Sequence, residues 1–75
     1  MGNVMDETFQ MRLRWLREHT HPVRSMTVTS QLMGFGKDTL GKYERGEAEP
    51  VMSALAAISD YYHVSVDYLM GRTNY

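Results

Sequence analysis

The chain has 75 residues and no cysteine, so it forms one small domain without a disulfide framework or a thiolate metal site. Its 43% apolar content excludes a disordered chain, and no apolar run is long enough to cross a membrane or serve as a signal peptide. The net charge of −1, taken as a total, argues against nucleic-acid binding. We therefore expect a small, soluble, cytoplasmic domain.

A first helix is predicted after a short disordered N-terminus, residues 1–5, which carries no periodic signal. Asp6 or Thr8 can cap the start of this helix through a side-chain oxygen. Apolar residues then recur at positions i, i+4 and i+7, as Phe9, Leu13 and Leu16. The helix should end by His21, because Pro22 disfavours helical geometry in the residue before it.

Two short helices are predicted on either side of Gly34, which supplies the left-handed conformation that ends the earlier one. Ser25 caps this second helix, and its apolar edge consists of Val28, Leu32 and Met33. Gly36 then caps a third helix that runs from Lys37 to Glu44. The inward residues of the third helix are Leu40 and Tyr43.

The clearest helical pattern covers residues 51–62, in which apolar side chains recur as Val51, Leu55, Ile58 and Tyr62. Ser65 caps a fifth, short helix that ends at Gly71, and residues 73–75 form a C-terminal tail. The side chains that pack from this helix are Val66, Leu69 and Met70. Residues 6–72 are therefore predicted to form one all-α domain of five helices.

The second and third helices, joined at Gly34, have the arrangement of a helix-turn-helix. Three segments make this interpretation specific: RLRWLRE at 12–18, GFGKDTLGKYERGE at 34–47 and VSVDYL at 64–69. With them, the chain from Arg12 to Arg72 resembles the Cro/phage-repressor (XRE-like) helix-turn-helix family. The resemblance implies a lambda-repressor-like fold, sequence-specific binding of operator DNA and transcriptional regulation, with repression as the expected outcome.

The resemblance assigns DNA base contacts to Lys37, Asp38 and Lys42. Thr39 stands where the family often touches phosphate, and we predict that it also approaches a base. Lysine can donate to O6 and N7 of guanine, and aspartate can accept from N4 of cytosine. The alternatives are a solvated helix face for the lysines and, for Asp38, a carboxylate that only opposes the helix dipole. Phosphate contacts are predicted for Arg24, Gly36 and Arg45, with plain solvation as the alternative for Arg24, which lies just before the second helix.

Arg17 and Glu44 match a pair that the family often joins as an ion pair between the first and third helices. We expect this pair to fix the third helix, with a direct phosphate contact of Arg17 as the alternative. Gly41 stands where relatives carry a side chain that reads a base, and it would leave a gap for water or a thymine methyl group.

The chain departs from the family pattern in its second helix. Met26 falls where the family commonly has a glutamine that braces the third helix, and methionine cannot make the same hydrogen bonds. Thr29 falls on a leucine core position, so the core of this helix is expected to shift towards Val28 and Leu32. The loop from Arg17 to Ser25 is also about two residues longer than usual.

No metal, cofactor or catalytic constellation is recognised. His19 and His21, with no cysteine or third histidine nearby, cannot complete a tetrahedral zinc site. No serine, histidine or aspartate stands in a nucleophile elbow or phosphate loop, so we expect no enzyme activity. Trp15 lies off the apolar stripe, where it would either fold over the helix edge or anchor an interface.

The charges divide unevenly along the chain. Residues 1–45 hold seven basic and five acidic side chains, whereas residues 46–75 hold one basic and four acidic. This division favours a DNA-binding first half and a second half that meets a protein partner. We predict a regulator that binds double-stranded DNA as a homodimer, with no membrane or small-molecule partner. The alternative is a protein-interaction module, or an antitoxin-like partner, with the same fold and little DNA affinity.

Overall fold

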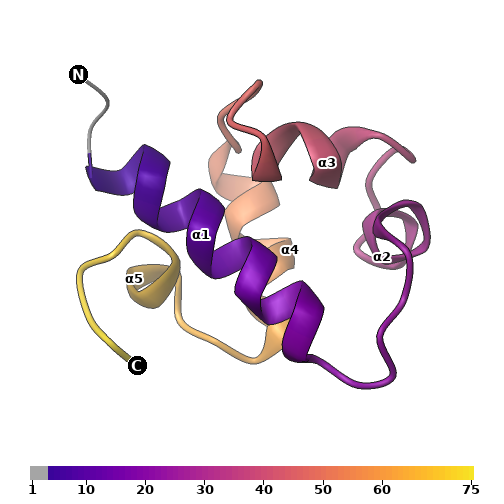
Figure 1. Cartoon of the computed structure of the whole chain (residues 1–75). Coiled ribbons are helices and arrows are strands. Elements are labelled where there is room, and N and C mark those ends of the chain that lie inside the picture. The colour runs from indigo at the N-terminus through magenta and orange to yellow at the C-terminus, as the bar shows by residue number, and fades with distance from the viewer. Residues whose placement is uncertain (1–3) are drawn as a thin grey trace.

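Five helices and no strand make up the described part of the chain, which is residues 4–75 for the backbone and residues 8–75 for the side chains. In the computed structural model the helices are α1 (Val4–His19), α2 (Met26–Leu32), α3 (Thr39–Glu44), α4 (Met52–Tyr62) and α5 (Val66–Leu69) (Figure 1). None of these helices is long and apolar enough to cross a membrane. The predicted all-α fold of five helices is confirmed.

The long helix α1 connects the two ends of the fold. It contacts α3 towards one end of the molecule and α5 towards the other, and α4 also packs on α5 (Figure 1). The short helix α2 lies at the edge of the molecule, where it packs on α3. The two helices on either side of Gly34 therefore form a pair that α1 holds through α3.

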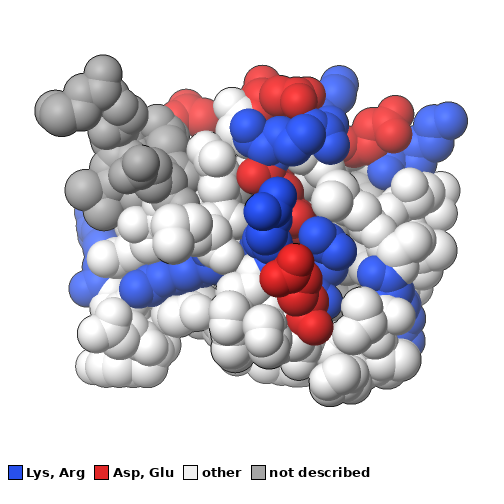
Figure 2. All heavy atoms as spheres, viewed as in Figure 1, with Lys and Arg blue, Asp and Glu red and all other residues white. Residues whose placement is uncertain are grey.

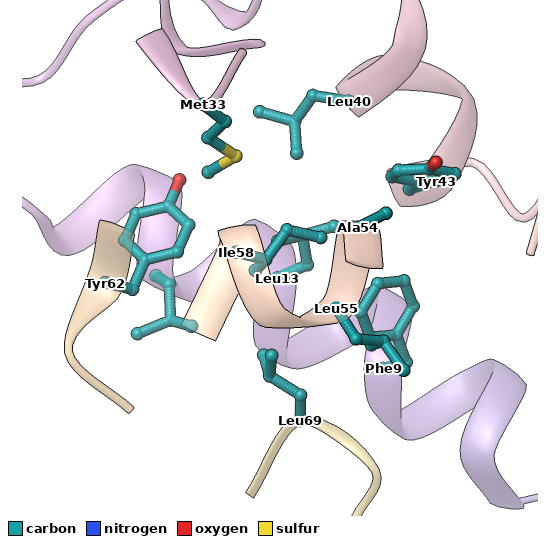
Figure 3. Close-up of a cluster of buried hydrophobic side chains, with 11 residues drawn as sticks. Phe9, Leu13, Met33, Leu40, Tyr43, Ala54, Leu55, Ile58, Tyr62 and Leu69 are labelled. Carbon is teal, nitrogen blue, oxygen red and sulfur yellow. The ribbon is translucent and has the colours of Figure 1, made fainter. Parts of the chain in front are cut away.

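One cluster of buried apolar side chains forms the core between the helices (Figure 3). Four fully buried residues come one each from four helices, and they are Leu13, Leu40, Ile58 and Leu69. Phe9 adds an aromatic contact, because its ring meets the edge of Tyr43 at a centroid distance of 6.5 Å. The predicted inward residues of α1 and α3 are all buried, so the helical spacing identified these faces correctly.

The starts of α1 and α3 differ from the predictions. α1 begins at Val4, two residues before Asp6, and the rest of the predicted disordered N-terminus, residues 1–3, lies outside the described residues. α3 begins at Thr39 with Asp38 as its N-cap, so the predicted start at Lys37 with Gly36 as cap is wrong. The reason is a turn, closed where the Thr39 N–H donates to the Gly36 carbonyl at 3.2 Å, which occupies the residues before α3.

The predicted inner face of α2 is also wrong. Val28 and Leu32 are 44% and 54% exposed, whereas Thr29 and Ser30 are buried. The Thr29 hydroxyl donates to the Ser25 carbonyl at 2.8 Å, which satisfies this buried group within its own helix. A short helix can bury polar side chains in this way when each of them finds a hydrogen-bond partner.

Most of the predicted helix ends are confirmed. The Ser25 and Ser65 hydroxyls accept from the N–H groups of the third residue that follows, as N-caps do. Gly34 has a φ of 88°, and the last turn of α4 is closed by His63 in the left-handed conformation with a φ of 57°. α4 itself begins at Met52, and Val51, predicted as part of its apolar stripe, is exposed.

The C-terminal residues are tied back to α1 by Arg12. Its Nη1 donates to the carbonyls of Tyr68 at 2.5 Å and of Thr73 at 2.6 Å, and its guanidinium lies 4.3 Å from the centre of the Tyr68 ring. Nη2 also reaches Oδ1 of Asn74 at 3.3 Å. The residues predicted as a tail therefore include two that contact the first helix.

Candidate nucleic-acid interface

The turn between α2 and α3 reverses the chain tightly at Gly34. The Gly34 N–H donates to the Gln31 carbonyl and the Phe35 N–H donates to the Ser30 carbonyl, both at 3.0 Å. The positive φ of Gly34 makes these bonds possible, and it is a conformation that side-chain-bearing residues rarely adopt. Phe35 then packs edge-on against Tyr43 at 5.8 Å, which fixes the turn to the core.

Ser30 joins α2 to the start of α3. Its hydroxyl donates to the Gly36 carbonyl at 2.5 Å and accepts from the Leu40 N–H at 3.1 Å. Ser30 is completely buried, so both bonds are shielded from water. Sequence reasoning missed this residue, although a small polar side chain four residues before the turn glycine was a signal that could have indicated it.

Three residues at positions i, i+4 and i+7 form the outward face of α3, with the first just before the helix and the last just after it. They are Asp38, Lys42 and Arg45, and all three are exposed. Lys37 is exposed in the turn just before them, and Thr39 is half-buried. Among residues 8–75, no hydrogen bond or ion pair engages the side chains of Lys37, Asp38 or Lys42.

The structure brings Arg17 and Glu44 together in a two-pronged ion pair. Arg17 Nε lies 2.8 Å from Glu44 Oε2, and Nη2 lies 3.1 Å from Oε1. The Glu44 side chain is only 1% exposed and that of Arg17 is 18% exposed. The hydrogen bonds that Arg17 donates to the Glu44 carboxylate raise the pKa of Arg17 above its usual value. The pair therefore fastens the end of α3 to α1 with a buried charge on the α3 side.

Arg45 folds back over α3, although its side chain stays about half exposed. Its Nε lies 2.6 Å from Oε2 of Glu47, and a Cβ placed on Gly41 would lie 2.8 Å from its Nη1. The same Cβ would lie 2.8 Å from Sδ of Met26, the first residue of α2. Gly41 is buried, so the gap expected at this position is instead filled by the side chains of Met26 and Arg45.

The other two predicted phosphate contacts are exposed, one just before α2 and one in the turn between α2 and α3. Arg24 is exposed just before α2, where its Nη1 donates to the Tyr61 hydroxyl at 3.3 Å. Gly36 is exposed in the turn before α3, and its carbonyl already accepts from Ser30 and Thr39. Within residues 8–75, no hydrogen bond engages the Gly36 N–H.

The charges on this side of the molecule are mixed. Figure 2 shows Lys and Arg side chains beside Asp and Glu side chains, both near α3 and along the middle of the face, instead of an unbroken basic surface. The segment 37–47 holds three basic and three acidic residues. A ligand on this face would therefore meet alternating charge, which favours specific contacts over general attraction.

The histidines do not converge on a metal site. His19 stacks on Trp15 with ring centroids 4.2 Å apart, and its Nδ1 lies 2.8 Å from the Trp15 carbonyl oxygen. His21 is exposed in the loop that follows. Across the described side chains, no group of three His, Cys, Asp or Glu residues could hold a metal ion. Trp15 is 53% exposed, and its aromatic contact is with His19 on the same helix.

Comparison with known proteins identifies relatives of the whole arrangement. The pattern of the helix-turn-helix domain family matches residues 10–69. The chain is 38% identical over 48 residues to the HTH-type transcriptional regulator AnsR of Bacillus subtilis (strain 168), covering 64% of this chain and 41% of that protein. It is 35% identical over 63 residues to the uncharacterized HTH-type transcriptional regulator YobD of the same organism, covering 84% and 54%. The chain thus spans about half the length of these relatives.

A solved structure shares the fold. The solution structure of the SOS-response transcriptional repressor LexA from Eubacterium rectale superposes with a TM-score of 0.80 at 17% identity, over 93% of this chain and 72% of that chain. The family pattern extends from the middle of α1 to the last residue of α5. The chain therefore belongs to the helix-turn-helix domain family, of the Cro/phage-repressor (XRE-like) kind that its sequence resembles.

Proposed function

We propose that this chain is a DNA-binding transcriptional regulator that recognises operator DNA through α3 and acts as a repressor in the cytoplasm. The outward face of α3 carries this proposal, because the exposed side chains of Asp38 and Lys42 are unengaged within residues 8–75. The inner face of the helix is fixed by Ser30 and Glu44. A rigid helix with free polar side chains is what reading base edges in the major groove requires. The names of the two relatives, both transcriptional regulators, support the same role.

Each predicted DNA contact has a distinct role in this proposal. Lys37 and Lys42 donate to guanine, Asp38 accepts from cytosine, and Thr39 approaches a base from the first turn of α3. Backbone phosphates are bound by Arg24, by the Gly36 N–H and by Arg45. The exposure of all these residues except Thr39 supports these assignments.

We further propose that the regulator binds as a homodimer through the acidic half of the chain. A largely apolar hollow between α4 and α5 supports this, and it is lined by Met52, Leu55, Ala56, Val66 and Met70. Met52 is 86% exposed there, and burying such a side chain stabilises an interface. A single short recognition helix binds weakly, so two half-sites would be needed for useful affinity.

The dimer is tested by Met52→Glu, which would place a charge on the apolar hollow. Sedimentation equilibrium should report a dimer for the unmodified chain and a monomer for this variant. Met11→Glu is the matched control, because Met11 is 71% exposed but lies on α1. A monomeric unmodified chain at high concentration would contradict the proposed dimer.

DNA binding is tested by selection from randomised duplex DNA, followed by gel shifts at two salt concentrations. We expect an enriched sequence whose affinity falls steeply as salt rises, because phosphate contacts release counterions. Lys42→Ala should weaken the free energy of binding to the selected sequence by about 1–3 kcal/mol and relax the preference at one base position. Arg72→Ala, which removes the same charge beyond α5, is the control and should keep the preference.

The alternative function is a protein-interaction module or antitoxin-like partner. The same apolar hollow and the mixed charge around α3 favour it. The selection experiment separates the two functions. A chain that binds no duplex even at low salt would be a protein-interaction module, and the DNA-binding proposal would be wrong.

A further inference from the structure

Glu47 is held in a fixed place beside Arg45 by the backbone that ends α3. The Glu47 N–H donates to the Lys42 carbonyl at 2.8 Å and the Gly46 N–H donates to the Tyr43 carbonyl at 3.2 Å. Gly46, with a φ of 73°, supplies the left-handed residue of this helix-terminating motif. The Glu47 carboxylate therefore faces Arg45 because the chain reverses there.

Arg45 meets this carboxylate with two nitrogens and α3 with the third. Nε lies 2.6 Å from Oε2, Nη2 donates to Oε1 at 3.4 Å, and Nη1 occupies the space above Gly41. The hydrogen bonds with Arg45 lower the pKa of Glu47, so its carboxylate is charged at neutral pH. Two of the three guanidinium nitrogens are thus hydrogen-bonded to Glu47, and the third lies against Gly41.

We propose that Glu47 is a positioning residue that holds Arg45 against α3 and competes with DNA phosphate for its guanidinium. This inference rests on the proposed function, because Arg45 is one of the three residues assigned to phosphate. A phosphate oxygen and the Glu47 carboxylate use the same donors, so Arg45 cannot pair fully with both. Both side chains are about half exposed, so the internal pair is weak enough for DNA to displace it.

The competition lowers the affinity of each recognition helix for any DNA. A domain in which Arg45 must first leave Glu47 gains less from a phosphate contact than one with a free arginine. Sequence-independent binding, which depends mainly on such contacts, is reduced accordingly. Occupancy of an operator then depends more strongly on the base contacts and on two domains binding together.

The test is the binding of Glu47→Gln to duplex DNA of random sequence over a range of salt concentrations. We expect about two- to five-fold tighter binding, the range that an exposed ion pair is worth. The log–log salt slope should steepen by up to about 0.9, because the one phosphate contact of Arg45 forms more fully when Glu47 no longer competes for it. Glu49→Gln is the matched control, because it removes an exposed carboxylate two residues away and should not change the slope.

Arg45→Gln in both backgrounds decides whether the effect acts through Arg45. The gain from Glu47→Gln should vanish when Arg45 is already glutamine. If the gain persists there, or if Glu49→Gln produces the same change of slope, Glu47 acts only by general repulsion and the proposal is wrong. Thermal unfolding followed by circular dichroism checks that each variant is folded.

Elution from immobilised heparin separates this inference from the proposed function. Heparin is a polyanion without bases, so release of Arg45 should delay the elution of Glu47→Gln relative to Glu49→Gln even if the chain does not bind DNA. A chain that fails to bind DNA but shows this delay would overturn the proposed function and keep the competition. Equal elution of the two variants would overturn the competition itself.

Discussion

Glu44, the last residue of α3, carries a negative charge into the interior, and Arg17 is the partner that compensates it. Arg17→Met would leave that carboxylate buried and unpaired, so we expect a loss of about 3–5 kcal/mol in the free energy of unfolding. Such a loss is a large part of the total stability of a small domain. Urea unfolding followed by circular dichroism measures it.

Two further variants show whether the loss comes from the unpaired charge. Arg14→Met removes an exposed arginine from the same helix and should change stability by no more than about 0.5 kcal/mol. The double variant Arg17→Met with Glu44→Leu should recover most of the loss, because it removes the buried charge as well. An unchanged stability in Arg17→Met alone would mean that the pair is not needed to hold α3.

Tyr62 makes the stability of the domain sensitive to alkaline pH. Burial of its hydroxyl, which has no hydrogen-bond partner within residues 8–75, raises its pKa, and the nearby Glu44 charge adds to this. Above about pH 10 the unfolded chain releases this proton while the folded chain keeps it, so stability falls as pH rises. The fall should be measured by urea unfolding between pH 8 and pH 11.

Tyr62→Phe removes this pH dependence. We expect its free energy of unfolding at pH 7 to differ by less than about 1 kcal/mol, because no bond is lost with the hydroxyl, and its alkaline fall to be smaller. Tyr75→Phe, at a site 90% exposed, is the control and should keep the unmodified profile. An identical alkaline fall in Tyr62→Phe would show that other groups cause it.

The joint between α2 and α3 depends on one hydroxyl. Ser30→Ala would leave the Leu40 N–H buried without its partner, so we expect a loss of about 1–3 kcal/mol in the free energy of unfolding. Thr27→Ala, at an exposed position of the same helix, should change stability by about 0.5 kcal/mol or less. Equal effects of the two substitutions would contradict the role of Ser30.

At the scale of the helices, local signals in the sequence were sufficient to predict several helix ends. Ser25, Gly34 and Ser65 act through their own local chemistry, and the ends that they predict are confirmed. The inner face of α2 could not be predicted from apolar spacing, because its buried residues are polar. Thr29 and Ser30 become buried only because their hydroxyls find backbone partners, and one of those partners, Leu40, is ten residues away.

The candidate interface likewise has some features that could be predicted from the sequence and one that could not. The positions of Lys42 and of the Arg17–Glu44 pair follow from the family resemblance, because these residues occupy fixed places on α1 and α3. The contact between Arg45 and Glu47 does not follow from any helical spacing, since residues two apart on a helix face different directions. It forms because the chain leaves the helix at Gly46 and returns towards α3.

At the scale of the whole molecule, Arg12 closes the fold by joining its first and last segments. Arg12→Met would remove the bonds to the Tyr68 and Thr73 carbonyls and the contact with the Tyr68 ring. We expect faster amide exchange throughout α5 and a loss of about 1–3 kcal/mol in the free energy of unfolding.

The effect of Arg12→Met should be confined to one end of the domain. Exchange in α2 and α3 should stay slow relative to α5, because the bonds of Ser30 and Glu44 do not involve Arg12. Arg72→Met, which removes an exposed arginine from the same segment, is the control and should leave exchange in α5 unchanged. Faster exchange in α3 as well would show that the two ends are coupled through α1.

The stacking of Trp15 on His19 gives the domain an optical reporter of an unusual kind. Trp15 is the sole indole of the chain, yet it lies on the outside of α1 rather than in the core. Because its surroundings are already half aqueous, its emission should shift little when the core unfolds. Its fluorescence instead follows the last turn of α1, residues 15–19, in which the imidazole covers the indole.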